Sequence, residues 1–345
     1  MTKNNLLLIA VVLGLVAALG VVKVVQSKRQ AARREPIVLY LPSPHPYCDA
    51  VAVGARAFAK ETGTGVRVAV GQEGTQANVN ANVESLFTVG YRAFSIYPLD
   101  PAGTRGLVGR LTRAGCVFVG YGAQPEAGTD MPFAVATDTR AAATLAAEKL
   151  IELMGRRGRI LNVLEGMTDA NTAIRKEAIE AVVAKYSDVQ ILQTIGDVTT
   201  EQKALEKMES ALVARGDEVD GIICTGYTTT VAGAMLLSER HKDPMRKRVR
   251  FVGLDTDERV IAAIRNGHID ATIAQNPYGH GYITCTLLKL MLDGWTPVER
   301  GYQFIDSGTV AVTRENLDTY EVDIRAVTAQ IVAAVKTKYL KPPGD

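Results

Sequence analysis

Short apolar runs alternate with longer amphipathic stretches along most of this chain. From Pro36 onward, runs of about five apolar residues predict β-strands, and each is followed by about twelve residues with helical spacing. The rhythm pauses after the run at 116–120 and restarts with a helical stretch at 140–154. Strands without a polar face that are joined through helices are typical of parallel sheets covered on both faces. We therefore expect two doubly wound α/β domains.

The boundaries of these elements follow from the apolar runs and from the Gly and Pro residues that interrupt them. After residue 292 we expect a region of mixed structure. The predicted strands cover residues 37–41, 66–70, 93–97, 116–120, 160–164, 189–194, 221–224, 249–254 and 271–274. The predicted helices cover residues 50–62, 77–89, 107–114, 140–154, 172–186, 200–214, 231–240, 260–266 and 281–292.

The N-terminus carries a different pattern, an unbroken apolar run over residues 6–22. Its length falls between the ~7–15 residues of a secretory h-region and the ~20 of a membrane-spanning helix. Ala18-Leu19-Gly20 offers a small-x-small cleavage site, whereas the basic residues that follow the run favour a cytoplasmic location for the rest of the chain. We predict that residues 1–35 form an apolar helix and linker that serve as a signal peptide or membrane anchor, and that the chain is exported.

Composition narrows the function further. Of the 345 residues 47% are hydrophobic and 22% charged, as in soluble globular proteins long enough for two domains. The 39 Lys and Arg residues nearly balance 37 Asp and Glu residues, so nothing indicates a nucleic-acid partner. The cysteines are too few and too scattered for a disulfide framework, and we expect them to be mostly buried apolar residues. They are Cys48, Cys116, Cys224 and Cys285.

Several signatures of enzymes and cofactor sites are absent from the sequence. No G-x-G-x-x-G follows a predicted strand, and neither a P-loop nor a G-x-S-x-G elbow occurs. The histidines lack the spacing of metal ligands, so we expect surface or helix-capping roles for them. We therefore expect no enzyme activity, cofactor or metal. The histidines are His45, His241, His268 and His280.

Polar and aromatic side chains gather in the loops after the predicted strands. In open α/β sheets ligands bind at the carboxyl ends of the strands, so these loops are the expected site. Amides and charged groups hydrogen-bond vicinal hydroxyls, and a tyrosine face covers the C–H surface of a ring, which suits a neutral polyol. The candidate ligand-binding residues are Ser43, His45, Tyr47, Tyr121, Asn171, Arg175, Tyr227, Asp255 and Gln275.

Three of these candidates are the most specific. Asp255 directly follows an apolar strand, where its carboxylate faces the site unless it caps the next helix. Arg175 lies near the start of a predicted helix, where a cation gains nothing from the helix dipole, so a ligand or carboxylate partner accounts for it better. Gln275 precedes Asn276-Pro277, and the proline ends the strand at a point that suits a crossing between domains.

Residues 251–282, FVGLDTDERVIAAIRNGHIDATIAQNPYGHGY, carry a family resemblance. They are similar to the ribose-binding type of periplasmic binding proteins, of the type I fold, which share a G-x-D strand end and an A-T-i-A-Q-x-P segment at this spacing. Weaker similarity extends from Pro36 to Leu317. It includes Pro46-Tyr47 in the opening loop, I-x-P-x-D at 96–100 and V-T-R-E-N-L at 312–317.

The resemblance implies two α/β lobes joined by three crossovers near 137–139, 275–277 and 305–308. The N-terminal lobe would comprise residues 36–137 and 277–306, and the C-terminal lobe residues 138–276 and 307–345. In this family a sugar is captured by closure between the lobes and delivered to the permease of an ABC transporter. The chain would then be a monomer in the periplasm or on the outer face of the inner membrane.

By the same resemblance, Asp255, Gln275 and Arg175 match polar residues that hold a pyranose, and Tyr47 matches a stacking aromatic. Ser43 and His45 occupy polar positions of the opening loop.

Some positions depart from the family pattern. The family's Asp-Arg pair after the fourth strand is Gly122-Ala123 here, its Asn after the strand at 221–224 falls on Gly226, and a second aromatic falls on Cys48. These losses make ribose itself doubtful and suit another sugar, a less hydroxylated ligand or a larger molecule.

Other functions stay open at this stage. A membrane-anchored sensory domain could keep residues 6–22 and signal to a kinase or chemoreceptor. A regulator of the lactose-repressor type needs a DNA-binding helix-turn-helix before the first strand, but only 35 mostly apolar residues precede it. The scaffold alone does not exclude an enzyme.

Overall fold

The computed structural model describes residues 36–344, and these residues divide into two compact units. Unit 1 comprises residues 36–136, 277–305 and 329–344, and unit 2 comprises residues 137–276 and 306–328. The predicted N-terminal helix, signal or anchor over residues 1–35 lies outside the described residues.

The chain passes between the units at 136–137, 276–277 and 305–306, where the three crossovers were expected. It passes once more, at 328–329, inside helix α11 (Tyr320–Lys338). The assignment of all residues from 307 onward to the C-terminal lobe is therefore wrong. Ile331, Val332 and Val335 of α11 pack in the core of unit 1, which ties the end of the helix to that unit.

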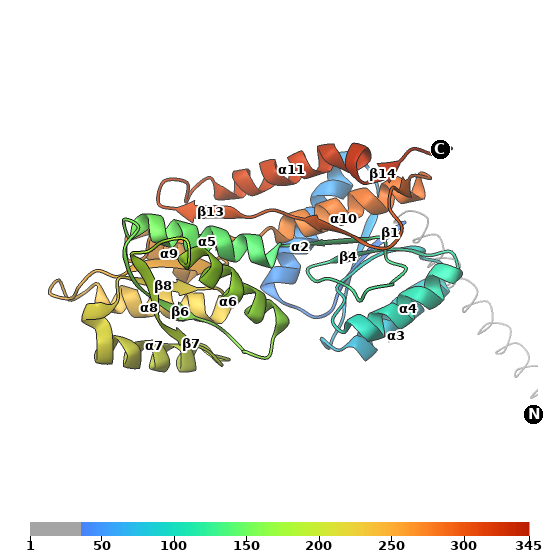
Figure 1. Cartoon of the computed structure of the whole chain (residues 1–345). Helices are drawn as coiled ribbons and strands as arrows, with labels where there is room; N and C mark the ends of the chain where they lie inside the picture. Colours follow the sequence, from blue (N-terminus) through green and yellow to red (C-terminus); the bar gives the residue numbers. More distant parts are fainter. Residues whose placement is uncertain (1–35, 345) are drawn as a thin grey trace, which may run out of the picture. The chain divides into compact units, whose positions relative to one another are not determined.

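Unit 1, whose strands β1 and β4 are labelled in Figure 1, is built on a six-stranded sheet with the strand order β12-β5-β4-β3-β1-β2. Its pairs from β2 to β5 are parallel, and Ile37 of β1 is in register with Val66 of β2 and Ala93 of β3. The strands are β1 (Ile37–Leu41), β2 (Val66–Val70), β3 (Ala93–Ile96), β4 (Val117–Tyr121), β5 (Phe133–Ala136) and β12 (Gln303–Asp306). The helices are α2 (Pro46–Thr62), α3 (Gln76–Val89), α4 (Pro101–Arg113) and α10 (Pro277–Leu292).

Helices cover both faces of this sheet. On one face, α3 and α4 pack on a core that contains Val38, Phe94 and Phe118. On the other face, α2 and α10 pack with the end of α11 on Leu39 and Val119. Because side chains alternate along a strand, both faces of each central strand are apolar, as the sequence pattern requires. A short pair, β11 (Thr296–Pro297) with β14 (Leu340–Lys341), completes the unit.

Helices α2 and α10 approach each other so closely that glycine is required at their contact. A Cβ atom at Gly281 would lie 1.9 Å from the backbone oxygen of Val51, and one at Gly54 would lie 1.9 Å from that of Tyr278. Both obstructing atoms belong to the backbone, so a side chain at either glycine would push the helices apart.

Unit 2 repeats this architecture with the strand order β13-β10-β9-β8-β6-β7. Its pairs from β7 to β10 are parallel, and β13 is antiparallel to β10. The strands are β6 (Gly158–Val163), β7 (Val189–Ile195), β8 (Gly221–Cys224), β9 (Arg250–Leu254), β10 (Ala271–Ala274) and β13 (Val310–Thr313). The helices are α5 (Thr139–Leu153), α6 (Ala170–Val183), α7 (Glu201–Arg215), the 3-10 turn η1 (Gly216–Glu218), α8 (Tyr227–Arg240) and α9 (Glu258–Arg265).

The core of unit 2 lies mainly between its sheet and helices α5 and α6, and contains Ile160, Ile223 and Val252. Helices α7, α8 and α9 pack side by side, and α8 contacts the sheet where Gly233 meets the ring of Phe251.

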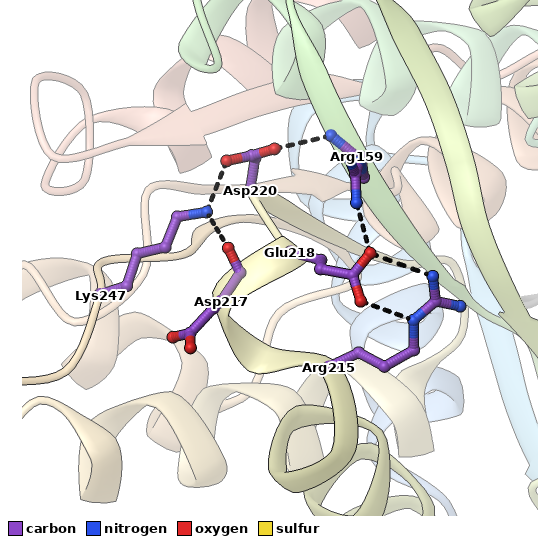
Figure 2. A network of polar contacts seen from close by, with 6 residues as sticks. All are labelled: Arg159, Arg215, Asp217, Glu218, Asp220 and Lys247. Atoms are coloured by element: carbon purple, nitrogen blue, oxygen red, sulfur yellow. Dashed lines mark hydrogen bonds and ion pairs between the residues drawn. The ribbon is translucent and has the colours of Figure 1, made fainter.

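An ionic network holds the amino edge of this sheet (Figure 2). The Arg159 backbone N–H donates to Asp220 at 2.8 Å, and Lys247 donates to the other oxygen of that carboxylate at 2.7 Å. Glu218 pairs with Arg159 and accepts from Arg215 at 3.1 and 3.2 Å. Since these pairs are largely exposed, each contributes little to stability. The network lies at the opposite end of the strands from the loops where ligand contacts are expected.

The predicted elements agree with the observed ones in type and order. The strands at 37–41, 66–70, 221–224 and 271–274 have the predicted bounds. Helices α2, α4 and α8 begin four to six residues earlier than predicted. The first turns of α4 and α8 carry no apolar periodicity, whereas in α2 Cys48 already belongs to the buried face of the helix. The strand β5 was not predicted.

All four cysteines are buried and free, as expected. Within the described part of the chain, every helix is too short or too polar to span a lipid bilayer.

The contact between α2 and α10 gives a stability prediction. Gly281→Ala should lower the free energy of unfolding by about 1–3 kcal/mol, because the new Cβ atom would displace backbone atoms of α2. Gly106→Ala, in the open middle of α4, is the matched control and should raise it by up to ~1 kcal/mol through helix propensity. Urea unfolding of both variants measures the difference. Equal stability of the two variants would contradict the close-contact account.

Candidate functional site

The strand order marks where each unit should bind a ligand. In unit 1 the chain leaves β1 for β2 on one side and returns to β3 on the other, and in unit 2 strand β6 lies between β7 and β8 in the same way. In such sheets the crevice opens at the carboxyl ends of the strands where the order reverses. The relevant loops follow β1 and β3 in unit 1, and β6 and β8 in unit 2.

Asp255 is fixed at the carboxyl edge of unit 2. It follows β9 with a left-handed backbone (φ 79°), which Asp tolerates better than most residues. Its N–H donates to the oxygen of Ile273 at 2.8 Å, and its carbonyl accepts from the Thr272 hydroxyl at 2.7 Å. The Gln275 amide donates to its carboxylate. Two of the predicted residues are thus held together by β10.

The environment of Asp255 raises the pKa of its carboxyl group. Desolvation is the main cause, and the hydrogen bond from Gln275 and the charge of Arg175 oppose it. The negative charge of Glu165 raises this pKa as well. The third specific prediction, Arg175, therefore acts electrostatically on the same carboxylate.

Several buried polar atoms of unit 2 have no hydrogen-bond partner among the described residues. They are Nε of Arg175, both amide atoms of Asn162 and the hydroxyls of Thr137 and Thr225. Arg175 shares a face of α6 with the buried Thr172 and Ile179, so it is directed toward the sheet. Each unsatisfied group costs about 1–3 kcal/mol. Such groups beside or at strand ends are suited to hydrogen bonds with a hydroxylated ligand.

Glu165 is a further residue at this edge, and it was not predicted. It follows β6 next to Gly226, which follows β8, and its carboxylate accepts from the N–H of Thr228 at 3.0 Å. A Cβ atom at Gly226 would lie 2.2 Å from Cδ of Glu165. The glutamate thus occupies the space of a side chain at 226.

The remaining predicted residues of unit 2 lie at helix N-termini. Asn171, in the first turn of α6, is exposed and accepts from the Thr139 hydroxyl at 3.3 Å. Tyr227 begins α8, is 42% exposed and donates to Asp257 at 2.6 Å. Both lie at the carboxyl edge, but neither contacts the Asp255–Gln275 pair in the hydrogen bonds observed.

In unit 1, Tyr47 is anchored by a buried histidine. Its hydroxyl forms a 2.7 Å hydrogen bond with Nδ1 of His280, which comes from the first turns of α10. Burial lowers the pKa of His280 to about 3, so the ring is neutral. The expectation of a surface or capping role for His280 is wrong, because the close approach of α2 and α10 encloses it.

Two tyrosines converge on the position after β4. A Cβ atom at Gly122 would lie 2.6 Å from the Tyr97 ring and 2.8 Å from the Tyr47 hydroxyl. Tyr97 follows β3 and stacks edge-on against Tyr121 at 5.7 Å between centroids. The carboxyl edge of unit 1 therefore presents two tyrosine rings beside Gly122, where the resemblance had led us to expect an Asp-Arg pair.

The opening-loop residues lie nearby with local roles. Ser43 faces the loop after β2, its hydroxyl 3.6 Å from the Cβ position of Gly74. His45 is exposed and caps α2 by accepting from the N–H of Tyr47 at 3.1 Å.

Tyr121 does not belong to the ligand edge. Its side chain has no exposed surface and lies in the core of unit 1, where its hydroxyl donates to the Tyr40 backbone oxygen at 2.9 Å. Burial raises the pKa of Tyr121 well above its usual value. The prediction of ligand contact failed because the last residue of a strand can still point into the core.

Together the two edges offer hydrogen-bond donors and acceptors and aromatic faces. Over residues 36–344 no group of three or more His, Cys, Asp or Glu side chains could hold a metal ion.

Residues 37–296 match the family model of the periplasmic binding protein domain. The chain belongs to the periplasmic binding protein family. Among curated relatives, the D-apiose import binding protein of Actinobacillus succinogenes is 27% identical over 235 residues, 67% of this chain and 73% of the relative. The xylitol-binding protein of Mycolicibacterium smegmatis is 25% identical over 59% of this chain, and the match spans 56% of that protein.

Solved structures share the fold at lower identity. A sugar ABC transporter sugar-binding protein from Bacillus halodurans aligns with a TM-score of 0.74 at 18% identity, over 82% of this chain and 98% of that one. A solute-binding protein from Burkholderia graminis in complex with D-arabinose aligns with a TM-score of 0.69 at 19% identity, over 82% and 96% of the two chains.

In this periplasmic binding protein, other side chains fill the space at two of the three departures from the expected pattern. At Gly122 the side chains of Tyr47 and Tyr97 fill the space, and at Gly226 the Glu165 carboxylate does so. The space of the missing side chains is filled from elsewhere in the chain, by Tyr47 of α2, by Tyr97 after β3 and by Glu165 after β6.

The neutral His280 gives a pH prediction. An unfolded histidine binds a proton near pH 6.5, whereas folded His280 does so only near 3, so its contribution to stability is complete above pH 6.5 and is lost as the pH falls toward 3. The free energy of unfolding should drop by roughly 2 kcal/mol from this residue between pH 7 and pH 5. Urea unfolding at both pH values should show a smaller drop for His280→Gln than for wild type.

His268→Gln serves as the control for this measurement and should change the drop less, because His268 is only partly buried. The same drop in His280→Gln as in wild type would contradict the neutral, buried state of His280.

Proposed function

We propose that this periplasmic binding protein captures a neutral sugar or polyol outside the cytoplasm and delivers it to the permease of an ABC transporter. The observation that carries the proposal is the carboxyl edge of unit 2. There Asp255 and Gln275 form a fixed acceptor–donor pair, and Arg175 and Asn162 keep buried polar atoms without protein partners. Vicinal hydroxyls, which both donate and accept, complement such a set.

Unit 1 supplies the apolar part of recognition. The Tyr47 and Tyr97 rings beside Gly122 present surface that suits the C–H face of a sugar, with Tyr47 oriented by His280. Burial of ring C–H groups and hydrogen bonds to hydroxyls together give a sugar its affinity.

The relatives support a small polyhydroxylated ligand. The named ligands of two of them, D-apiose and xylitol, are uncharged and carry several hydroxyl groups. The D-arabinose complex concerns a protein of the same fold. An extracytoplasmic location and a permease partner accord with family membership, and residues 1–35 would supply the signal or anchor.

A ligand screen tests the proposal. Thermal unfolding of the purified chain should be measured with D-apiose, xylitol, D-arabinose and D-allose, and with nucleosides and amino acids for comparison. A ligand at 100 times its Kd stabilises the folded state by about 2.7 kcal/mol, so at least one sugar or polyol should raise Tm by several degrees. A shift with amino acids alone, or with no compound, would overturn the proposal.

Asp255→Asn tests the site within that function. It keeps the residue's size and its tolerance of a left-handed backbone but removes the charge-assisted acceptor, so the Kd for the sugar should rise more than tenfold with little change in Tm. Calorimetric titration measures this change.

Asp270→Asn is the matched control, because Asp270 lies at the amino end of the same strands. Its carboxylate accepts from the backbone N–H of Phe251 and from the guanidinium of Arg250. It should lower Tm and leave the Kd unchanged. Equal affinities of wild type and Asp255→Asn would remove Asp255 from the site.

A further inference from the structure

The Glu165 side chain occupies the space that a side chain at position 226 would fill, at the point where the strand order of unit 2 reverses. Val163 and Cys224 are the last in-register pair of β6 and β8, and Glu165 and Gly226 each follow two residues later. The Gly226 backbone is extended (φ −150°, ψ 159°), a conformation open to any residue. The glycine is therefore required by space, because Cδ and Oε1 of Glu165 lie 2.2 and 2.5 Å from its Cβ position.

Among the described residues, a hydrogen-bond donor contacts only one of the two carboxylate oxygens of Glu165. Oε1 accepts from Thr228 N–H at the start of α8, whose N-cap position provides no side-chain hydrogen bond of its own. Among the described residues the second oxygen has no hydrogen-bond partner. Glu165 follows β6 and Asp255 follows β9, the two neighbours of β8 in the sheet, so both carboxylates lie at the same carboxyl edge.

We propose that Glu165 is a ligand-contacting residue whose second oxygen accepts hydrogen bonds from sugar hydroxyls, and that it selects neutral sugars against sugar acids. This inference rests on the proposed function and adds a specificity determinant to it.

The selectivity follows from charge. A carboxylate only accepts hydrogen bonds, so it pairs with hydroxyl donors and repels a ligand carboxylate, whereas an amide accommodates both. Asp255 adds a second carboxyl group, and Arg175 is the cation that acts on it. A sugar acid at this edge would meet two carboxyl groups and one guanidinium.

Glu165→Gln separates ligand contact from helix capping. The glutamine oxygen can still accept from Thr228, so α8 stays capped while the negative charge is lost. Calorimetric titration with D-arabinose, xylitol and D-arabinonate measures the preference for neutral ligands. We expect the ratio of the arabinonate Kd to the Kd of the better neutral ligand to fall at least tenfold in Glu165→Gln, with Tm nearly unchanged.

Thr200→Ala is the control, because Thr200 caps α7 through the N–H of Lys203 at 3.2 Å. It should lower Tm and leave the ratio unchanged. An unchanged ratio in Glu165→Gln, with neutral binding intact, would overturn the inference and leave the proposed function standing. If wild type bound neither neutral probe nor any sugar of the screen, both would fall.

The effects of substitutions at Glu165 and at Gly226 on affinity should not be additive. Gly226→Asn alone should lower both Tm and affinity, since the new side chain collides with Glu165. In the Glu165→Ala background the same substitution has space and restores an amide to the edge, so affinity for the neutral ligand should rise at least tenfold over Glu165→Ala. Additive effects of the two substitutions would contradict the shared space.

Discussion

The side-chain space that glycine leaves open determines which groups reach the carboxyl edges of both units. In unit 1, Gly281 and Gly54 let α2 and α10 approach to backbone contact, which encloses His280 and holds it against the Tyr47 hydroxyl. The same principle acts at the strand ends, where Gly122 admits two tyrosines. The aromatic edge of unit 1 therefore depends on helix packing as much as on the loops.

In unit 2 the space beside a glycine is filled by a polar side chain. Gly226 admits the Glu165 carboxylate, and β10 fixes Asp255 through its backbone and through Gln275. Buried polar groups without protein partners are costly, and native proteins keep them mainly where another molecule satisfies them. An aromatic edge and a hydrogen-bonding edge are the two chemistries that sugar recognition combines.

The sequence was sufficient for the fold and for the strand-end positions of Asp255 and Gln275, which the structure brings together. Apolar runs identify the inner strands because both their faces are buried, and Asp255 and Gln275 follow such runs directly. Helix starts were placed late where first turns lack aliphatic residues at helical spacing, as in α4 and α8. Glu165 and the buried contact of His280 were not predicted, because their positions depend on contacts between segments far apart in the chain. Tyr121 was misassigned because proximity to a strand end does not fix which way a side chain points.

In the proposed function, the carboxyl edge of unit 2 holds a neutral sugar by its hydroxyls. A crystal structure of the chain with the sugar that binds best tests this most directly. We expect ligand hydroxyls at hydrogen-bond distance, about 2.6–3.2 Å, from Asp255 and Gln275. A sugar bound elsewhere, such as beside the Arg159–Glu218 network at the amino edge (Figure 2), with no contact to either residue, would contradict it.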